Sequence, residues 1–225
     1  MTTSLLNSLL RALLRWGAAL VFCLPLRHRS HFWARACGML FPLLLLAQLL
    51  DPLAQSTTLW QQQLLLLVLY VSFFALLGGM IYLCTDINKK GAMYCAVWSL
   101  LIAQCAYESW CFLELQFARY GHPLNMASPW AVLVQLLSGA VFFAAVYILL
   151  ARQLPYKGDY HIGPRQLFSA FFIGILFMVQ AAVLDNARAE HTPLSLTVTI
   201  LIGQFYFITL LYFQSELFKK SAMEK

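Results

Sequence analysis

The sequence predicts an all-α membrane protein, a bundle of seven transmembrane helices. Its 225 residues are 61% hydrophobic and only 11% charged, with a mean hydropathy of +0.73. A soluble domain carries about 25% charged residues, so most of this surface is not expected to meet water. Apolar stretches of roughly 20 residues, the length that spans a hydrocarbon core of about 30 Å, alternate with short polar breaks. This pattern excludes an ordinary cytosolic enzyme, a disordered tail and a disulfide-stapled secreted module.

Seven stretches meet the length requirement, and each is expected to be helical because lipid cannot satisfy an open backbone. They are Leu5–Leu26, Phe32–Leu50, Trp60–Cys84, Ala92–Leu115, Pro129–Ala151, Gln166–Leu184 and Leu194–Phe213. The first is not expected to be a removable signal peptide, since it contains arginines and no small-residue cleavage site follows it. No loop is long enough to fold alone. We expect one membrane domain over residues 1–216, followed by the start of a cytoplasmic helix at 217–225.

Lysine and arginine residues predict the orientation of the chain. Cytoplasmic loops carry an excess of these residues, and one set of loops holds most of them while the opposite loops hold only Arg119 and Arg188. The N-terminus is therefore expected outside and the C-terminus in the cytoplasm, with an odd number of spans. Because the positive residues are in loops between spans, nucleic acid is not an expected partner. The residues on the basic side are Arg27, Arg29, Arg35, Lys89, Lys90, Arg152, Lys157, Arg165, Lys219, Lys220 and Lys225.

Ionisable residues inside the predicted spans are the strongest candidates for function, because a charge at the bilayer centre costs at least about 2.5–3.5 kcal/mol. Gln104 and Glu108 are four residues apart and share one helix face, as do Arg11 and Arg15. Glu108, Arg11 and Arg15 are expected in the outer half of the membrane, where an Arg–Glu contact is feasible. With Glu114, they could form a polar pocket that binds a peptide or an anionic group. The alternative interpretation is a structural ion pair, or arginines that snorkel to the headgroups.

Other chemistry-bearing residues favour structural roles. None of the six cysteines forms a CxxC pair, and buried thiols behave as small hydrophobes. Gln135, Gln180 and Gln204 are expected to bridge neighbouring helices, for about 0.6 kcal/mol each. The sequence has no HExxH, nucleophile elbow or GxxxxGK[ST] motif. Neither catalysis nor a metal or other cofactor is therefore expected of these residues.

Three segments resemble the membrane region of bacterial sensor histidine kinases that end in a GHKL-type ATPase domain, the group that includes peptide-sensing quorum kinases. Leu24–Arg35 resembles the first inside loop, where a basic cluster precedes a His-Phe-Trp-x-Arg string. Tyr82–Asp86, together with Ala92–Glu108, resembles a later inside loop and the fourth span. Leu211–Lys225 resembles the exit from the last span into the signalling helix.

The resemblance implies a multi-pass sensor module of a two-component system in the bacterial cytoplasmic membrane, either a stand-alone relative or the front part of a kinase. It implies a second copy as partner, and an extracellular peptide or small molecule as signal. The phosphoacceptor histidine and ATP-binding boxes are not among these residues, so no kinase activity is implied. A small solute carrier, or the membrane-embedded binding subunit of a vitamin importer, is the alternative class. The implied output helix contains Glu216, Leu217, Phe218, Lys219 and Lys220.

Overall fold

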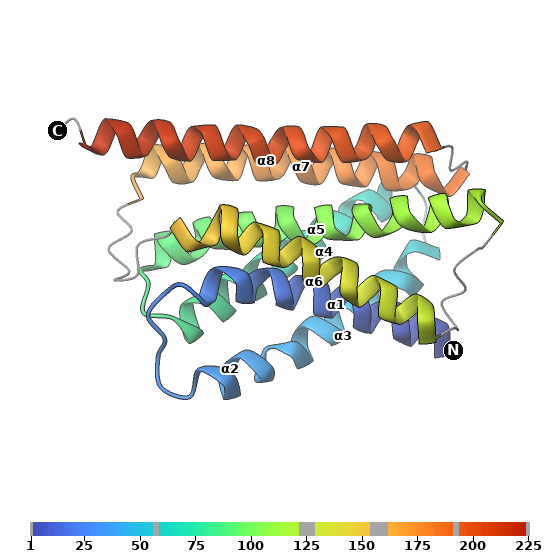
Figure 1. Ribbon diagram of the computed structural model, residues 1–225, viewed down its shortest axis with the longest axis horizontal. Coiled ribbons are helices and arrows are strands. Elements are labelled where there is room, and N and C mark those ends of the chain that lie inside the picture. Colours follow the sequence, from blue (N-terminus) through green and yellow to red (C-terminus); the bar gives the residue numbers. More distant parts are fainter. Residues whose placement is uncertain (1, 56–58, 122–128, 154–161, 191–193, 224–225) are drawn as a thin grey trace.

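The computed structural model (Figure 1) describes residues 2–55, 59–121, 129–153, 162–190 and 194–223. Over these residues the regular secondary structure is helical, and a single isolated β-bridge joins two loops. If the second and third helices are counted as one interrupted helix, the seven segments lie where the sequence predicts them, which confirms the all-α class. The elements are α1 Thr2–Cys23, α2 Phe32–Gly38, α3 Leu40–Gln55, α4 Leu59–Cys84, α5 Lys89–Arg119, α6 Pro129–Leu149, a 3-10 turn Ala151–Gln153, α7 Pro164–Glu190 and α8 Leu194–Met223.

Several helices are long and apolar enough to cross a membrane, as expected of a multi-pass membrane protein. In the described part of the chain, four segments meet the full span length and two shorter ones are apolar; α1, which contains two arginines, is not among these six. That all seven segments cross the bilayer therefore stays a prediction. The four long segments are Phe32–Leu49, Leu67–Cys84, Lys89–Arg119 and Pro129–Leu149, and the two shorter ones are Pro164–Gln180 and Thr197–Phe213.

The second predicted span is two helices rather than one, because of Pro42. A proline inside a helix has no N–H to donate, and its ring crowds the carbonyl four residues earlier, here that of Gly38. The helix is interrupted at Met39, whose N–H still bonds the Arg35 carbonyl oxygen at 3.1 Å. The chain therefore bends at this point without losing its direction.

The last helix is longer than its apolar stretch predicts. The apolar stretch predicts that the helix ends at Phe213, but α8 continues to Met223. The added residues include Gln, Glu, Leu, Lys, Ala and Met, which are good helix formers, and contain neither Gly nor Pro. A single helix therefore runs across the boundary we expected at residue 217; residues 224–225 of the predicted signalling helix lie outside the described residues.

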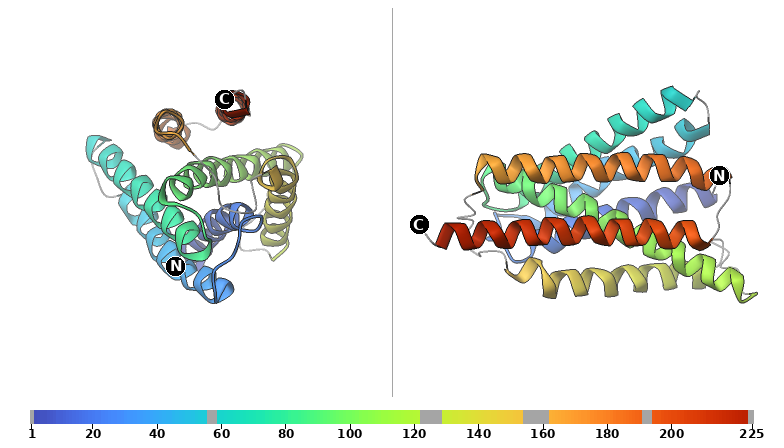
Figure 2. Two further views of the ribbon diagram at one scale, coloured as in Figure 1. Left: turned by 90° about the vertical axis from the view of Figure 1, so that its left-hand side faces the viewer. Right: turned by 90° about the horizontal axis from the view of Figure 1, so that it is seen from above.

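The central element of the bundle is α5. It contacts α1, α4, α6, α7 and α8, and its side chains are buried almost without interruption from Gly91 to Trp110. Viewed along the bundle, α1 lies on one side of α5, whereas α7 and α8 lie together on the other (Figure 2). Any change in how α1 packs can therefore reach α8 only through α5 or its neighbours.

The two ends of the bundle differ in charge. Figure 1 shows α1 beginning at one end and α8 finishing at the other, as an odd number of passes requires. The basic residues after α1, around the start of α5, after α6 and at the start of α7 lie at the end where α8 finishes. Lys157 and Lys225 lie outside the described residues. Arg119 is exposed at the opposite end.

The start of α5 depends on an N-terminal cap. The side-chain oxygen of Asn88 accepts a hydrogen bond from the Gly91 N–H at 2.7 Å. Replacing such a cap with alanine costs about 1 kcal/mol, so Asn88→Ala is expected to lower the midpoint of thermal unfolding in detergent. Asn88→Asp keeps the accepting oxygen and is expected to behave like the parent. Equal loss in both variants would contradict the capping role.

Candidate functional site

The residues predicted to matter inside the membrane lie on α1 and α5, two helices that pack against each other. Among the described residues, the buried charged side chains are Arg15, 9% exposed, and Glu108, 2% exposed. They come from α1 and α5, the two helices between which the sequence predicted an Arg–Glu contact. We call Arg11, Arg15, Gln104, Tyr107 and Glu108 the polar cluster.

The α1 arginines are held by aromatic rings and by backbone. The Arg11 guanidinium donates to the Tyr107 hydroxyl at 3.4 Å and lies 5.3 Å from the centre of that ring. Arg15 lies 4.1 Å from the centre of the Phe73 ring of α4 and donates to the Arg11 carbonyl oxygen at 3.3 Å. A desolvated cation over an aromatic face gains about 2 kcal/mol or more. These contacts place Arg11 beside the residue that precedes Glu108, so the depths predicted for the two helices are compatible.

On α5 the predicted Gln104–Glu108 pair is formed. The Gln104 amide donates to a Glu108 carboxylate oxygen at 3.0 Å, and both side chains are buried. Val97 is seven residues before Gln104 and so lies on the same helix face. A methyl group added at Gly174 of α7 would lie 3.3 Å from the Val97 side chain, so Val97 faces α7. The face of α5 that carries the pair is therefore the face that contacts α7 nearer the basic end.

Glu114 does not share this face. It is six residues after Glu108, which turns its side chain well away around the helix, and it is half-buried. It is seven residues after Tyr107, so it lies on the face of α5 that carries Tyr107 rather than on the face that carries Gln104 and Glu108. Its place in a shared polar pocket stays a prediction. The sequence analysis in turn missed Tyr107 and Phe73, which contact the arginines, because aromatic residues in apolar spans look like ordinary core.

Gln135 and Gln204 are buried and Gln180 is half-buried; that their amides bridge neighbouring helices stays a prediction. The side-chain oxygens of Gln135, Gln180 and Gln204 have no hydrogen-bond partner among the described residues, nor has the Thr197 hydroxyl. Gln180 of α7 instead packs its amide against the bare Cα of Gly203 on α8. The Gln180 side chain therefore contributes close packing between α7 and α8.

The cysteines are not paired with one another. All six thiols are free, and no group of His, Cys, Asp and Glu there could hold a metal ion. Cys37 is exposed and Cys111 is half-buried, whereas the other four are buried.

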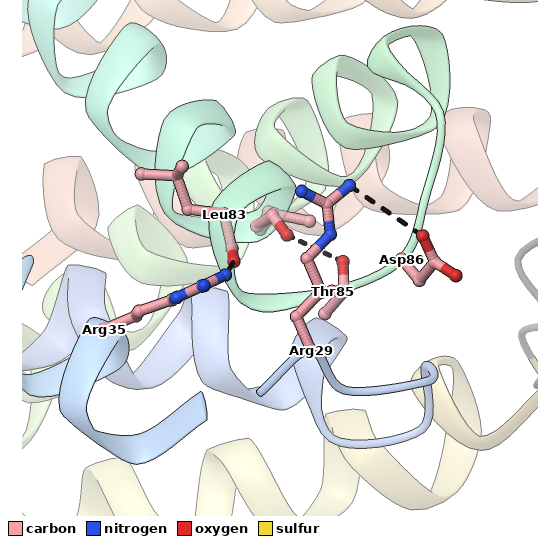
Figure 3. Close-up of polar contacts among 6 residues, drawn as sticks. Arg29, Arg35, Leu83, Thr85 and Asp86 are labelled. Carbon is pink, nitrogen blue, oxygen red and sulfur yellow. Dashed lines mark hydrogen bonds and ion pairs between the residues drawn. The ribbon is translucent and has the colours of Figure 1, made fainter. Parts of the chain in front are cut away.

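A second polar feature joins two loops at the basic end (Figure 3). The Asp86 N–H donates to the Arg27 carbonyl oxygen at 2.9 Å, and the Arg29 N–H donates to the Cys84 carbonyl oxygen at 3.0 Å. Between them, His28 and Thr85 form an antiparallel bridge. We call this pairing of residues 27–29 with 84–86 the loop clip.

Side chains reinforce the loop clip. One Arg29 nitrogen lies 3.8 Å from an Asp86 carboxylate oxygen, and the guanidinium lies 5.0 Å from the centre of the Tyr82 ring. Arg35 of α2 donates to the Leu83 carbonyl oxygen at 2.8 Å (Figure 3). The loop after α1 and the loop between α4 and α5 are thereby fastened together, and His31, in the left-handed conformation with φ 58°, starts α2 beside them.

The helices and the buried charges define the class of the molecule, a multi-pass helical membrane protein. Comparisons with protein-family models, with curated proteins and with solved structures found no match for this chain. The resemblance to sensor histidine kinases therefore stays a prediction. Two of the three segments that carry it, Leu24–Arg35 and Tyr82–Asp86, meet in the loop clip, which the sequence analysis did not foresee.

Proposed function

We propose that the chain is the membrane sensor module of a two-component-type signalling protein, with all seven segments crossing the bacterial cytoplasmic membrane and the N-terminus outside. The observation that carries the proposal is the unbroken α8. Its 30 residues make a rod of about 45 Å, longer than a hydrocarbon core of about 30 Å. A movement of α8 within the bundle would therefore reach the cytoplasmic turn at Glu216–Met223 undiminished.

The path from the polar cluster to α8 is short. Gln104 and Glu108 belong to α5, which packs directly against both α1 and α8. On α8 the buried residues Ile200, Gln204 and Leu211 share one face; the first two are about one turn apart and the last two about two turns apart. Phe207 also packs edge-on against Phe177 of α7, with ring centres 6.0 Å apart. A change at the polar cluster that shifts α5 would therefore alter the packing along this whole face of α8.

The signal in this proposal is an extracellular peptide or a small anionic molecule that engages the arginines of α1. Such a ligand acts only if it binds one packing of the bundle more tightly than the other. The chain itself would carry no catalytic step and need no cofactor. Its only output would be the position of the output helix.

A second copy of the chain is the partner we propose for α8. Tyr206 lies in the middle of the apolar segment Thr197–Phe213, and its side chain is 61% exposed. Tyrosine favours the membrane interface rather than the core, because its hydroxyl needs a polar partner. Pairing of two parallel α8 helices about a two-fold axis would cover this side chain and bring both output helices together.

A small solute carrier or the binding subunit of a vitamin importer is the alternative function. Carriers place their sites at helices interrupted at matched positions in two halves. In the described part of the chain the break at Met39 lies within a single helical segment, which favours the sensor. The reading frame that follows Lys225 distinguishes the two: a histidine-containing helix and an ATPase domain would support the sensor, and a neighbouring ATPase-plus-scaffold operon the importer.

The orientation can be tested by labelling introduced cysteines. Arg119→Cys and Arg152→Cys, both at exposed positions, would each be made in a Cys37→Ser background. In sealed right-side-out vesicles, a membrane-impermeant maleimide is expected to label position 119 at once and position 152 only after permeabilisation. The reverse pattern would contradict the proposed orientation, and labelling of both in intact vesicles would contradict an odd number of passes.

The proposed coupling can be tested with a spin label at the output helix. The label is attached to Lys220→Cys in the Cys37→Ser background. Glu108→Gln is expected to change the mobility of this label, because it removes a buried charge from α5, which packs against α8. Glu114→Gln is the matched control on the same helix and is expected to leave the spectrum unchanged. If Glu108→Gln lowers only thermal stability and the spectrum is that of the parent, the polar cluster is structural and the sensor proposal fails.

A further inference from the structure

The basic end of the bundle concentrates positive charge around the loop clip. Arg27, Lys89 and Lys90 are exposed, and the Arg29 side chain is 33% exposed. Asp86 is the acidic residue that faces them, and it contacts Arg29 through a single pair of atoms 3.8 Å apart. A guanidinium has five N–H donors in a fixed fork, so one contact of this length leaves most of the Arg29 donors for another acceptor.

Apolar side chains are exposed beside these charges. Leu24 and Leu83 are 42% and 45% exposed, and Trp33 is 60% exposed. Leu24 comes three residues before Arg27, and the Leu83 backbone is bonded to Arg35, two residues after Trp33. A surface that offers both arginines and exposed apolar groups suits a ligand with an anionic head and a hydrocarbon tail.

We propose that the loop clip is a binding site for the headgroup of an anionic phospholipid. Arg27 and Arg29 hold the phosphate, since a guanidinium binds phosphate through two parallel hydrogen bonds. Trp33 and Leu83 contact the first part of the acyl chains, where an amphipathic ring is favoured. The Asp86 carboxylate competes with the phosphate for Arg29.

A lipid explains this surface better than a soluble polyanion does. The clip lies at the ends of α1 and α4, where the apolar helices stop and headgroups are expected. A nucleic acid or an acidic peptide would neutralise the arginines but leave Trp33 and Leu83 uncovered. The proposal does not depend on the sensor function; it requires only that the bundle lies in a membrane.

The test measures lipid retained by the whole chain. Protein in phosphatidylcholine nanodiscs, with or without phosphatidylglycerol, would be released and weighed by native mass spectrometry, with inorganic phosphate as a soluble competitor. Near a membrane each Lys or Arg contributes about fivefold to the affinity for anionic lipid. Arg27→Gln with Arg29→Gln is therefore expected to reduce phosphatidylglycerol retention by about tenfold or more. Inorganic phosphate is expected not to displace the lipid, and displacement would contradict a lipid site.

Two control variants make the result specific. Arg152→Gln with Arg165→Gln removes the same charge from exposed positions at the same end of the bundle and is expected to retain the lipid. Asp86→Asn breaks the ion pair of the clip but keeps its cations, so retention is expected to be equal or higher. Equal loss in both arginine pairs would indicate diffuse attraction, and loss in Asp86→Asn would indicate that the clip is only structural; either result overturns the proposal.

A milder variant covers the case in which the double variant does not fold. Arg27 is exposed, and it joins the clip through its backbone carbonyl. Arg27→Gln alone is therefore expected to fold normally and to lose about fivefold in phosphatidylglycerol retention. Unchanged retention in this variant would also overturn the proposal.

Discussion

Glu108→Ala is expected to lower the free energy of unfolding of the bundle by about 3–5 kcal/mol, the usual cost of leaving a buried charge uncompensated. Glu108 and Arg15 are the buried charges in the described part of the chain, and they carry opposite sign. Removing the carboxylate takes away one of these two opposite buried charges, while the Arg15 cation stays buried over the Phe73 ring. It also takes away the acceptor of the Gln104 amide.

The measurement is unfolding in detergent followed by tryptophan fluorescence, with two comparisons. Glu114→Ala changes a half-buried carboxylate on the same helix and is expected to stay within about 1 kcal/mol of the parent. Arg15→Met combined with Glu108→Leu replaces both charges by apolar groups, which is often neutral or stabilising. The free energy of unfolding of this double variant is expected to be close to that of the parent. If the double variant is as unstable as the sum of its single variants, the two charges do not compensate one another.

The same comparison separates the two interpretations that the sequence left open. A structural ion pair requires only that the charges balance, so the apolar double variant should keep the position of the output helix. A ligand site requires the charges themselves, so the double variant should fold well and lose its response. Stability alone therefore cannot establish the sensor role, which is why the spin label at residue 220 is needed beside it.

The helices were predictable from the sequence because a bilayer imposes one length on every span. Glu108, Gln104, Arg11 and Arg15 could also be found, since an ionisable residue in an apolar helix is conspicuous and a spacing of four places two residues on one face. In the structure Gln104 bonds Glu108, and Arg11 bonds Tyr107, the residue before Glu108; a contact between an arginine and Glu108 stays a prediction. Glu114 was grouped with them on depth alone; on α5 it shares the face of Tyr107 and not that of Gln104 and Glu108.

What the sequence did not predict depends on contacts between segments far apart in the chain. The loop clip is made mainly by backbone groups of residues 27–29 and 84–86, and backbone pairing leaves no periodic pattern in side chains. The break at Met39 did have a signal, Pro42, which a hydropathy window averages away. The Gln204 side-chain oxygen has no hydrogen-bond partner among the described residues. This could not be foreseen, because an isolated glutamine in a span is equally consistent with a bridge between helices.

Glu216→Pro is expected to uncouple the end of α8 from the rest of the bundle. Proline at this position removes the hydrogen bond to the Tyr212 carbonyl and crowds that carbonyl with its ring, at a cost of about 3 kcal/mol or more for a helix interior. It also disfavours a helical conformation at Ser215. The label at Lys220→Cys is expected to become mobile and to stop responding to Glu108→Gln. The bundle itself should keep its thermal stability, because residue 216 follows the apolar segment that ends at Phe213.

The control is a label placed before the proline. Phe213→Cys lies on the bundle side of residue 216, so its label is expected to respond to Glu108→Gln whether or not the proline is present. Glu216→Ala removes the same carboxylate but favours a helix, and the label at residue 220 should respond as in the parent. If the label at 220 still responds across the proline, the signal does not travel along α8 as a rod. The continuity of this helix, on which the proposed function depends, would then have no mechanical role.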